Sequence, residues 1–172
     1  MVYLFYTLVI ILSFLGMEAI AWGLHKYVMH KSMWYVHKDH HIPGNKKFQR
    51  NDFFALVFGI PSWLLMMFGI MAGNDFRLYM GIGVTLYGIC YVLVHDGLIH
   101  QRFKIFTNTK NPYLIALRKG HWAHHKFDGS KTHDKDKDIC YGMLWVPPRF
   151  YKEAKEYLNN KIQNKETVVS AK

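Results

Sequence analysis

Three long apolar runs, separated by polar segments, dominate the pattern of the chain. Residues 2–24 carry a single charge, Glu18, and residues 53–73 and 78–94 carry none. About 20 apolar residues cross a bilayer as a helix, so the first two runs suffice and the third lies at the short end of the range. The short segment 73–77 joins the last two runs. The pattern therefore predicts three membrane helices, the last two forming a hairpin.

The polar segments beyond these runs also have helical spacing, and they hold most of the histidines. The sequence thus predicts an all-α integral membrane protein with about three to four transmembrane helices and a histidine-rich helical cap on the cytoplasmic side. We expect residues 1–150 to form the membrane-embedded domain and residues 151–172 a solvated, partly helical tail. The alternative is a soluble domain with three buried helices. No Lys or Arg precedes the first run, so it is expected to be an uncleaved helix and not a signal peptide.

The distribution of basic residues predicts how the helices are oriented. Of the 22 Lys and Arg residues, 6 lie in residues 25–52, one lies at the hairpin turn and 15 lie in residues 96–172. Basic segments stay in the cytoplasm, so both should lie on the inner side of the cell inner membrane. This topology, with contact to anionic membrane lipids, explains the net charge of +10. Without a recognisable nucleic-acid module, we expect no nucleic-acid partner.

Ten of the eleven histidines form four clusters that repeat one pattern. H-x4-H followed by H-x2-H-H occurs twice, and each copy begins at or just beyond the cytoplasmic end of a predicted span. The first copy consists of His25, His30, His37, His40 and His41, and the second of His95, His100, His121, His124 and His125. His133 stands outside the pattern in the charged run KTHDKDKD and is expected in a solvated loop. Neither Cys90 nor Cys140 is expected to form a disulfide or a thiolate metal site.

The chemistry and number of these histidines indicate metal binding. All-imidazole ligation suits Zn, Cu, Fe or Ni, and ten ligands are too many for one ion, so we expect two ions with about five ligands each. An α-helix presents the three rings of H-x2-H-H on one side. The two rings of H-x4-H lie about 140° apart on a regular α-helix. They could converge through a π-bulge or a fraying end, or serve two different ions, and the count of ten favours the second arrangement.

Three carboxylates stand close to these histidines in the sequence. Glu18 lies within an apolar span, where a charged group is costly and suggests function. It precedes His25 by seven residues and shares nearly the same helix face, so we expect it to support a ligand or handle protons. Asp39 and Asp96 either accept N–H bonds from neighbouring imidazoles or are simply solvated. Glu18 and Asp96 are the candidate catalytic residues.

Five ordered blocks give the chain a resemblance to a known family. GMEAIAWGLHKYVMH, HKDHH, NDFFALVFG, YGICYVLVHDGLIHQRF and HWAHH resemble the bacterial β-carotene 3-hydroxylases, a branch of the membrane fatty acid hydroxylase superfamily. The resemblance covers most of residues 10–148. It implies that the ten clustered histidines bind two non-haem iron ions, for which zinc or another metal could substitute. It also implies an O2-dependent monooxygenase that hydroxylates C3 of the β-ionone rings, converting β-carotene through β-cryptoxanthin to zeaxanthin.

Other functions would share some of these features. A related hydroxylase or desaturase acting on a fatty acid, a sterol or another carotenoid would have the same clusters. A haem-binding electron carrier would place isolated histidines within paired spans. A metal transporter would need polar residues through the bilayer, where this chain offers only Glu18.

A monooxygenase of this kind also needs electrons and a route for its substrate. The glycines at 81, 83 and 88 lie inside a span and follow no strand, so they are not a dinucleotide fingerprint. A separate ferredoxin or NAD(P)H-linked reductase is therefore expected, with Arg102, Lys104, Arg118 and Lys119 as candidate docking residues. Gly59, Gly69, Gly81, Gly83 and Gly88 could leave room for a carotenoid entering from the bilayer. Close helix packing is the simpler explanation for any single glycine.

Overall fold

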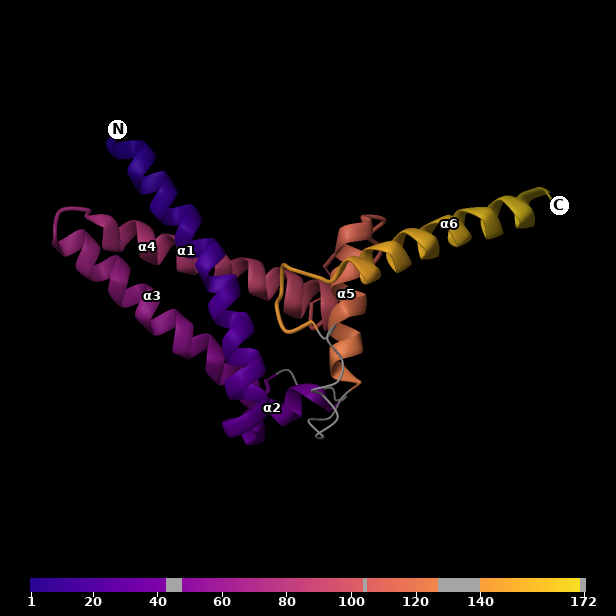
Figure 1. Ribbon diagram of the computed structural model, residues 1–172, viewed down its shortest axis with the longest axis horizontal. Helices are drawn as coiled ribbons and strands as arrows, with labels where there is room; N and C mark the ends of the chain where they lie inside the picture. Colours follow the sequence, from indigo (N-terminus) through magenta and orange to yellow (C-terminus); the bar gives the residue numbers. More distant parts are fainter. Residues whose placement is uncertain (43–47, 104, 127–139, 171–172) are drawn as a thin grey trace.

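The computed structural model describes residues 1–42, 48–103, 105–126 and 140–170, and these ranges are built from helices (Figure 1). Two regular helices continue without a break into π-helices, in which the backbone bonds five residues back instead of four. In chain order the elements are α1 (Val2–Leu24), the π-helix η1 (His25–Ser32), α2 (Trp34–His41), the short 3-10 helix η2 (Arg50–Asp52), α3 (Phe53–Met71), α4 (Phe76–Tyr91), the π-helix η3 (Val92–Ile99), α5 (Pro112–His125) and α6 (Pro148–Ser170). Lys104 and His133 lie outside the described residues.

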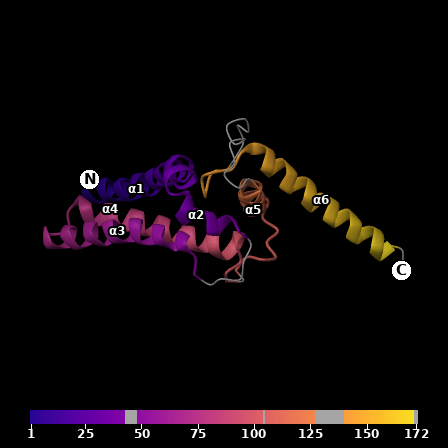
Figure 2. The same cartoon turned by 90° about the horizontal axis from the view of Figure 1, so that it is seen from below.

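Three helical stretches are long and apolar enough to cross a membrane, as the sequence predicts: Val2–Ser32, Arg50–Met71 and Phe76–Ile99. The third is longer than its apolar run because η3 continues α4. Figure 1 shows the N-terminus and the α3–α4 turn at one end of the bundle, with α2 and α5 at the other. Figure 2 shows α1 lying on one side of the α3–α4 pair. Both copies of the histidine pattern therefore lie at the same end of the bundle.

Local chemistry explains the tight hairpin. Gly73 and Asn74 have φ angles of +83° and +66°, a left-handed conformation that glycine and asparagine tolerate best. Asp75 then caps α4 by accepting the backbone N–H of Arg77 at 3.0 Å. Close to the turn the helices touch, since a Cβ added to Gly69 would lie 2.2 Å from the backbone nitrogen of Leu78. A small residue at this position therefore allows the close approach of α3 and α4.

The last two helices form a separate hydrophobic contact. Asn111 caps α5 by accepting the backbone N–H of Tyr113 at 2.9 Å. Ile115 and Ala116 of α5 then pack against Phe150 and Ala154 of α6. Beyond this contact α6 runs away from the bundle (Figure 2). The predicted boundary at residue 150 thus falls inside one helix, whose first turns belong to the core and which continues to Ser170.

Candidate metal centre

Nine of the ten patterned histidines gather into two groups whose ring nitrogens lie within 4.8 Å of one another. Group one consists of His25, His30, His37, His41 and His124, and group two of His40, His95, His100 and His121. The tenth, His125, adjoins group two, with its Nε2 2.8 Å from that of His121. The structure therefore brings together all ten histidines predicted as ligands.

The two π-helices explain how each H-x4-H pair converges. Both His25 and His30 belong to group one, and both His95 and His100 belong to group two. In a π-helix residues five apart are about one turn apart, so their side chains point the same way. The expectation from the count of ten that the two rings of a pair would serve different ions was wrong, and the alternative of convergence through π-helical geometry is confirmed. The chain instead changes its helical winding where each span reaches its histidines.

The H-x2-H-H clusters behave in the opposite way, because each divides its rings between the two groups. His37 and His41 join group one, whereas His40, between them, joins group two, with its Nε2 3.0 Å from that of His95. In the second copy His124 crosses to group one, with its Nε2 3.1 Å from that of His30. Each copy of the pattern thus gives its middle histidine of H-x2-H-H to the other copy's group.

In group one, hydrogen bonds at Nδ1 of two histidines determine whether their Nε2 atoms carry a proton or a lone pair. His25 donates from Nδ1 to the backbone carbonyl of Tyr141 at 2.8 Å, and His37 donates from Nδ1 to Oδ1 of Asn51 at 2.7 Å. Each neutral ring then has a bare lone pair on Nε2. The two Nε2 atoms face each other at 3.1 Å. Two lone pairs at this distance repel each other, so the arrangement fits a cation between them.

Group two repeats this arrangement. His95 donates from Nδ1 to Oδ1 of Asp96 at 2.8 Å, and His40 donates from Nδ1 to Oε1 of Gln49 at 3.1 Å. Their Nε2 atoms face each other at 3.0 Å. Two nitrogens bound at right angles to one ion, with bonds of about 2.1 Å, also lie about 3 Å apart. The donor set and its spacing therefore fit a transition-metal ion in each group.

Protonation does not relieve these contacts near neutral pH. Burial lowers the pKa of His37 to about 4 and places the pKa of His40, His121 and His124 well below the ordinary value. Burial likewise lowers the pKa of His100 and His125 to about 2. These six rings are therefore neutral near pH 7, which is the form that binds metal.

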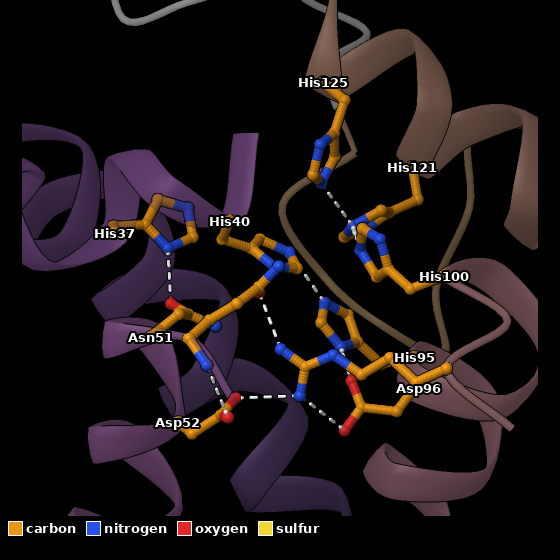
Figure 3. A network of polar contacts seen from close by, with 11 residues as sticks. His37, His40, Asn51, Asp52, His95, Asp96, His100, His121 and His125 are labelled. Atoms are coloured by element: carbon orange, nitrogen blue, oxygen red, sulfur yellow. Dashed lines mark hydrogen bonds and ion pairs between the residues drawn. The ribbon is translucent and has the colours of Figure 1, made fainter. Parts of the chain in front are cut away.

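A polar network from η2 supports both groups (Figure 3). Arg102 donates to Oδ1 of Asp52 at 2.9 Å and to Oε1 of Gln49 at 2.6 Å. Its guanidinium also lies 3.6 Å from Asp96, the partner of His95. Gln49 and Asn51 hold His40 and His37, so one short segment orients a ring in each group. Sequence reasoning missed this segment, although its polar residues stand directly before an apolar span.

The three predicted docking residues that the structure describes are engaged in contacts within the chain, and the fourth, Lys104, lies outside the described residues. Arg102 belongs to the network just described, with its side chain 16% exposed, so it is not available as a docking residue. Arg118 donates to the carbonyl of Phe106 at 3.2 Å, and Lys119 lies 3.4 Å from the carboxylate of Glu153. Asp39 accepts the backbone N–H of Arg50 at 2.7 Å, so it supports the η2 segment and not an imidazole.

A cavity of about 1280 Å³ lies among α1, α3 and α4 and reaches both groups. His25 and His37 line it from group one, and His95, His100 and His121 from group two. Toward the membrane interior its walls are mainly apolar, with Met17, Phe58, Met66 and Val84 among them. The cavity therefore joins the candidate metal ligands to the apolar part of the bundle.

The family model described as fatty acid hydroxylase matches residues 10–145. The chain belongs to the fatty acid hydroxylase family. The match includes every histidine of both groups, the η2 segment and Glu18. This family is iron-dependent, and the two histidine groups at the end of the membrane helices could hold metal ions.

Similar proteins include carotene hydroxylases from bacteria and an alga. The chain is 36% identical to the "Beta-carotene hydroxylase" of Pantoea ananas, covering 86% of this chain and 81% of that protein. It is 40% identical to the "Beta-carotene hydroxylase" of Pseudescherichia vulneris, covering 81% and 76%. It is 41% identical to the "Beta-carotene 3-hydroxylase, chloroplastic" of Haematococcus lacustris, covering 67% of this chain and 38% of that longer protein. No solved structure gives a significant match.

The η2 segment, taken as Arg50–Asp52 together with its N-cap residue Gln49, offers a matched pair of substitutions. We expect Asn51→Leu to weaken metal binding in group one, and Gln49→Leu to weaken it in group two, by about 10–100-fold each. The reason is that each change removes the acceptor that fixes the orientation and tautomer of one ligand. Metal analysis after dialysis against a graded chelator checks this. Unchanged metal retention in both variants would show that the amides do not orient the rings.

Glu18 binds the segment just before the start of α6 and not a histidine. Its Oε1 accepts the backbone N–H groups of Met143, Leu144 and Trp145 at 3.0, 2.9 and 2.9 Å. Its Oε2 accepts the hydroxyl proton of Tyr87 at 2.7 Å. The held segment begins just after Tyr141, whose carbonyl orients His25. The contacts therefore support a positioning role, while the proton-handling role predicted for Glu18 remains a separate hypothesis.

Substitutions at Glu18 separate these two roles. We expect Glu18→Leu to lower metal content and turnover by about 10–100-fold, because three backbone N–H groups lose their acceptor and His25 loses its support. Glu18→Gln keeps a carbonyl oxygen for these donors and is expected to retain most activity. Tyr87→Phe, which removes one bond only, is the matched control. A Glu18→Gln variant with full metal content and no turnover would instead indicate proton handling.

Proposed function

We propose that this chain is a non-haem di-iron monooxygenase that hydroxylates C3 of the β-ionone rings of β-carotene, giving β-cryptoxanthin and then zeaxanthin. The observation that carries the proposal is that the two histidine groups lie at one end of a mainly apolar cavity. The carotene hydroxylases among its relatives support this substrate. A fatty acid, a sterol or another carotenoid is the alternative substrate for the same chemistry.

The reaction must balance electrons as well as atoms. Each hydroxylation consumes one O2, two electrons and two protons, places one oxygen atom in the new C–OH group and releases the other as water. When bound, two iron ions would supply the O2 chemistry that attacks an unactivated C–H bond. The histidines of groups one and two would hold these ions. Zinc or another metal with affinity for imidazole could take the same positions.

The side chains of the chain contribute positioning and exclusion of water. The Nδ1 bonds to Tyr141, Asn51, Gln49 and Asp96 keep the ligand rings oriented without movement during the reaction. Apolar cavity walls keep bulk water away from the reacting carbon. Asp96 accepts the hydrogen bond from Nδ1 of His95 and lies 3.6 Å from the guanidinium of Arg102. We therefore assign Asp96 a positioning role.

The proposal also includes a location and an electron source. Basic segments flank the histidine end of the bundle, which favours a cytoplasmic position for both groups at the inner membrane. Electrons would come from a separate ferredoxin or an NAD(P)H-linked reductase. Because Arg102 is occupied by its ion pairs, the donor must use other basic residues of this face.

Pigment analysis tests the proposed function. The chain is expressed in cells that accumulate β-carotene, and pigments are separated and identified by mass and by comparison with standards. We expect β-cryptoxanthin followed by zeaxanthin. Absence of hydroxylated carotenoids, with the protein inserted in the membrane and loaded with metal, would overturn the choice of substrate. Hydroxylated fatty acids or sterols in the same cells would identify the alternative.

A further inference from the structure

The glycines of the α3–α4 hairpin fall into two classes. Gly69 and Gly81 lie toward the turn, where the helices touch. A Cβ added to Gly81 would lie 2.6 Å from the side chain of Met66 and 2.8 Å from the carbonyl of Ser62. Gly59 and Gly88 lie nearer the histidines, and a Cβ added to either would meet nothing within 4 Å. Helix packing therefore explains the first pair but not the second.

Gly59 and Gly88 both line the cavity that reaches the histidine groups. Both are exposed at the surface of the bundle, within stretches long and apolar enough to cross the membrane. Trp63 and Ile89 line the same cavity and are 57% and 51% exposed. Figure 1 shows α3 and α4 moving apart from the turn toward the histidine end. The cavity thus has an opening between these helices that would face lipid.

The opposite wall of the cavity is closed. Met17 of α1 and Tyr87 of α4 are buried against each other and against Met143. Helices α4 and α1 pack closely at Gly83, since a Cβ added there would lie 2.5 Å from the carbonyl of Ile10. A molecule dissolved in the bilayer can therefore reach the cavity from the face bordered by Gly59 and Gly88, opposite α1.

Glycine in a helix is less favourable than alanine, and no neighbour requires glycine at these two positions. We propose that the opening between α3 and α4 is the portal through which a long apolar substrate with a terminal ring enters from the bilayer, and that Gly59 and Gly88 set its width. The inference rests on the proposed function for the identity of that substrate. A side chain at either glycine would project into the opening and obstruct the ring.

Substitutions at the portal test this inference. Gly59→Leu and Gly88→Leu are compared with Gly16→Leu, a matched control on α1 where an added Cβ also meets nothing and which does not line the cavity. Gly88→Ala provides a smaller change. Each purified, metal-loaded protein is placed in lipid nanodiscs containing β-carotene. The readouts are metal content, β-carotene retained after washing and hydroxylated product with a chemical or protein electron donor.

We expect both leucine variants at the portal to retain full metal content while β-carotene retention and product fall at least about 10-fold, because the added side chain excludes the ring. β-Carotene retention and product in Gly88→Ala should lie between those of the leucine variants and those of the wild type. Both quantities in Gly16→Leu should match the wild type. Wild-type retention and product in both portal variants, or an equal loss in Gly16→Leu, would overturn the portal. Wild-type protein that retains β-carotene without converting it, while the portal variants lose it, would support the portal and overturn the proposed reaction.

Discussion

Replacing His124 by Ala should abolish hydroxylation, with a fall in turnover of more than about 100-fold, while the protein stays in the membrane. His124 is fully buried and belongs to group one, although it lies on α5 with the ligands of group two. Loss of its ring removes one of five imidazoles and leaves a cavity among the others. We expect metal content to fall from about two ions per chain toward about one.

His40→Ala is the reciprocal change and should have a similar effect on group two. His40 lies on α2 beside His37 and His41, yet its Nε2 faces that of His95. Metal content measured by mass spectrometry, together with product formation, checks both variants. His133→Ala, outside the repeated pattern, is the control and should keep near-normal activity. Substantial activity in His124→Ala would remove this residue from the ligand set.

Mild acid should release the metal and destabilise the protein. Above pH 6.5 both the folded and the unfolded chain hold neutral histidines. Burial lowers the pKa of His37 to about 4 and those of His100 and His125 to about 2 in the folded chain. As the pH falls below 6.5, the histidines of the unfolded chain therefore bind protons while those of the folded chain do not. The free energy of unfolding therefore decreases as the pH falls from 6.5 toward these values. Unfolding separates the ligands of each group, so the metal is released together with the loss of the fold.

Metal content and the thermal unfolding midpoint, measured in detergent between pH 7.5 and 5, check this expectation. Both should fall together, and adding ferrous iron after return to pH 7.5 should restore activity. A thermal unfolding midpoint that stays constant down to pH 5 would contradict the lowered pKa values of the buried histidines.

The membrane helices and the metal centre were both predictable from the sequence, for simple physical reasons. Apolar runs of sufficient length have few alternatives to a spanning helix, and the three spans agree with those of the structure. The doubled histidine pattern predicted two groups because so many clustered imidazole nitrogens are commonly used to bind metal ions. These inferences depend on composition and spacing and not on detailed geometry.

The internal arrangement of the centre depended on features that sequence spacing does not specify. The π-helices at His25–Ser32 and Val92–Ile99 change which residues share a face. The crossing of His40 and His124 depends on how α2 and α5 approach each other. The contacts of Glu18 with Met143 and of Arg102 with Asp52 join residues more than 40 positions apart, so the local sequence did not indicate them. Such contacts are set by tertiary packing.

The exchange of His40 and His124 has a consequence for biosynthesis. Group one is completed only when His124 has been made, 83 residues after His41. At about 5–20 residues per second, the ribosome needs about 4–17 s for that interval. During this time group one lacks its fifth ligand, His124. Full metal loading must therefore follow insertion of the whole α3–α4 hairpin. The newly made chain is thus present as an apo-protein before it becomes an active enzyme.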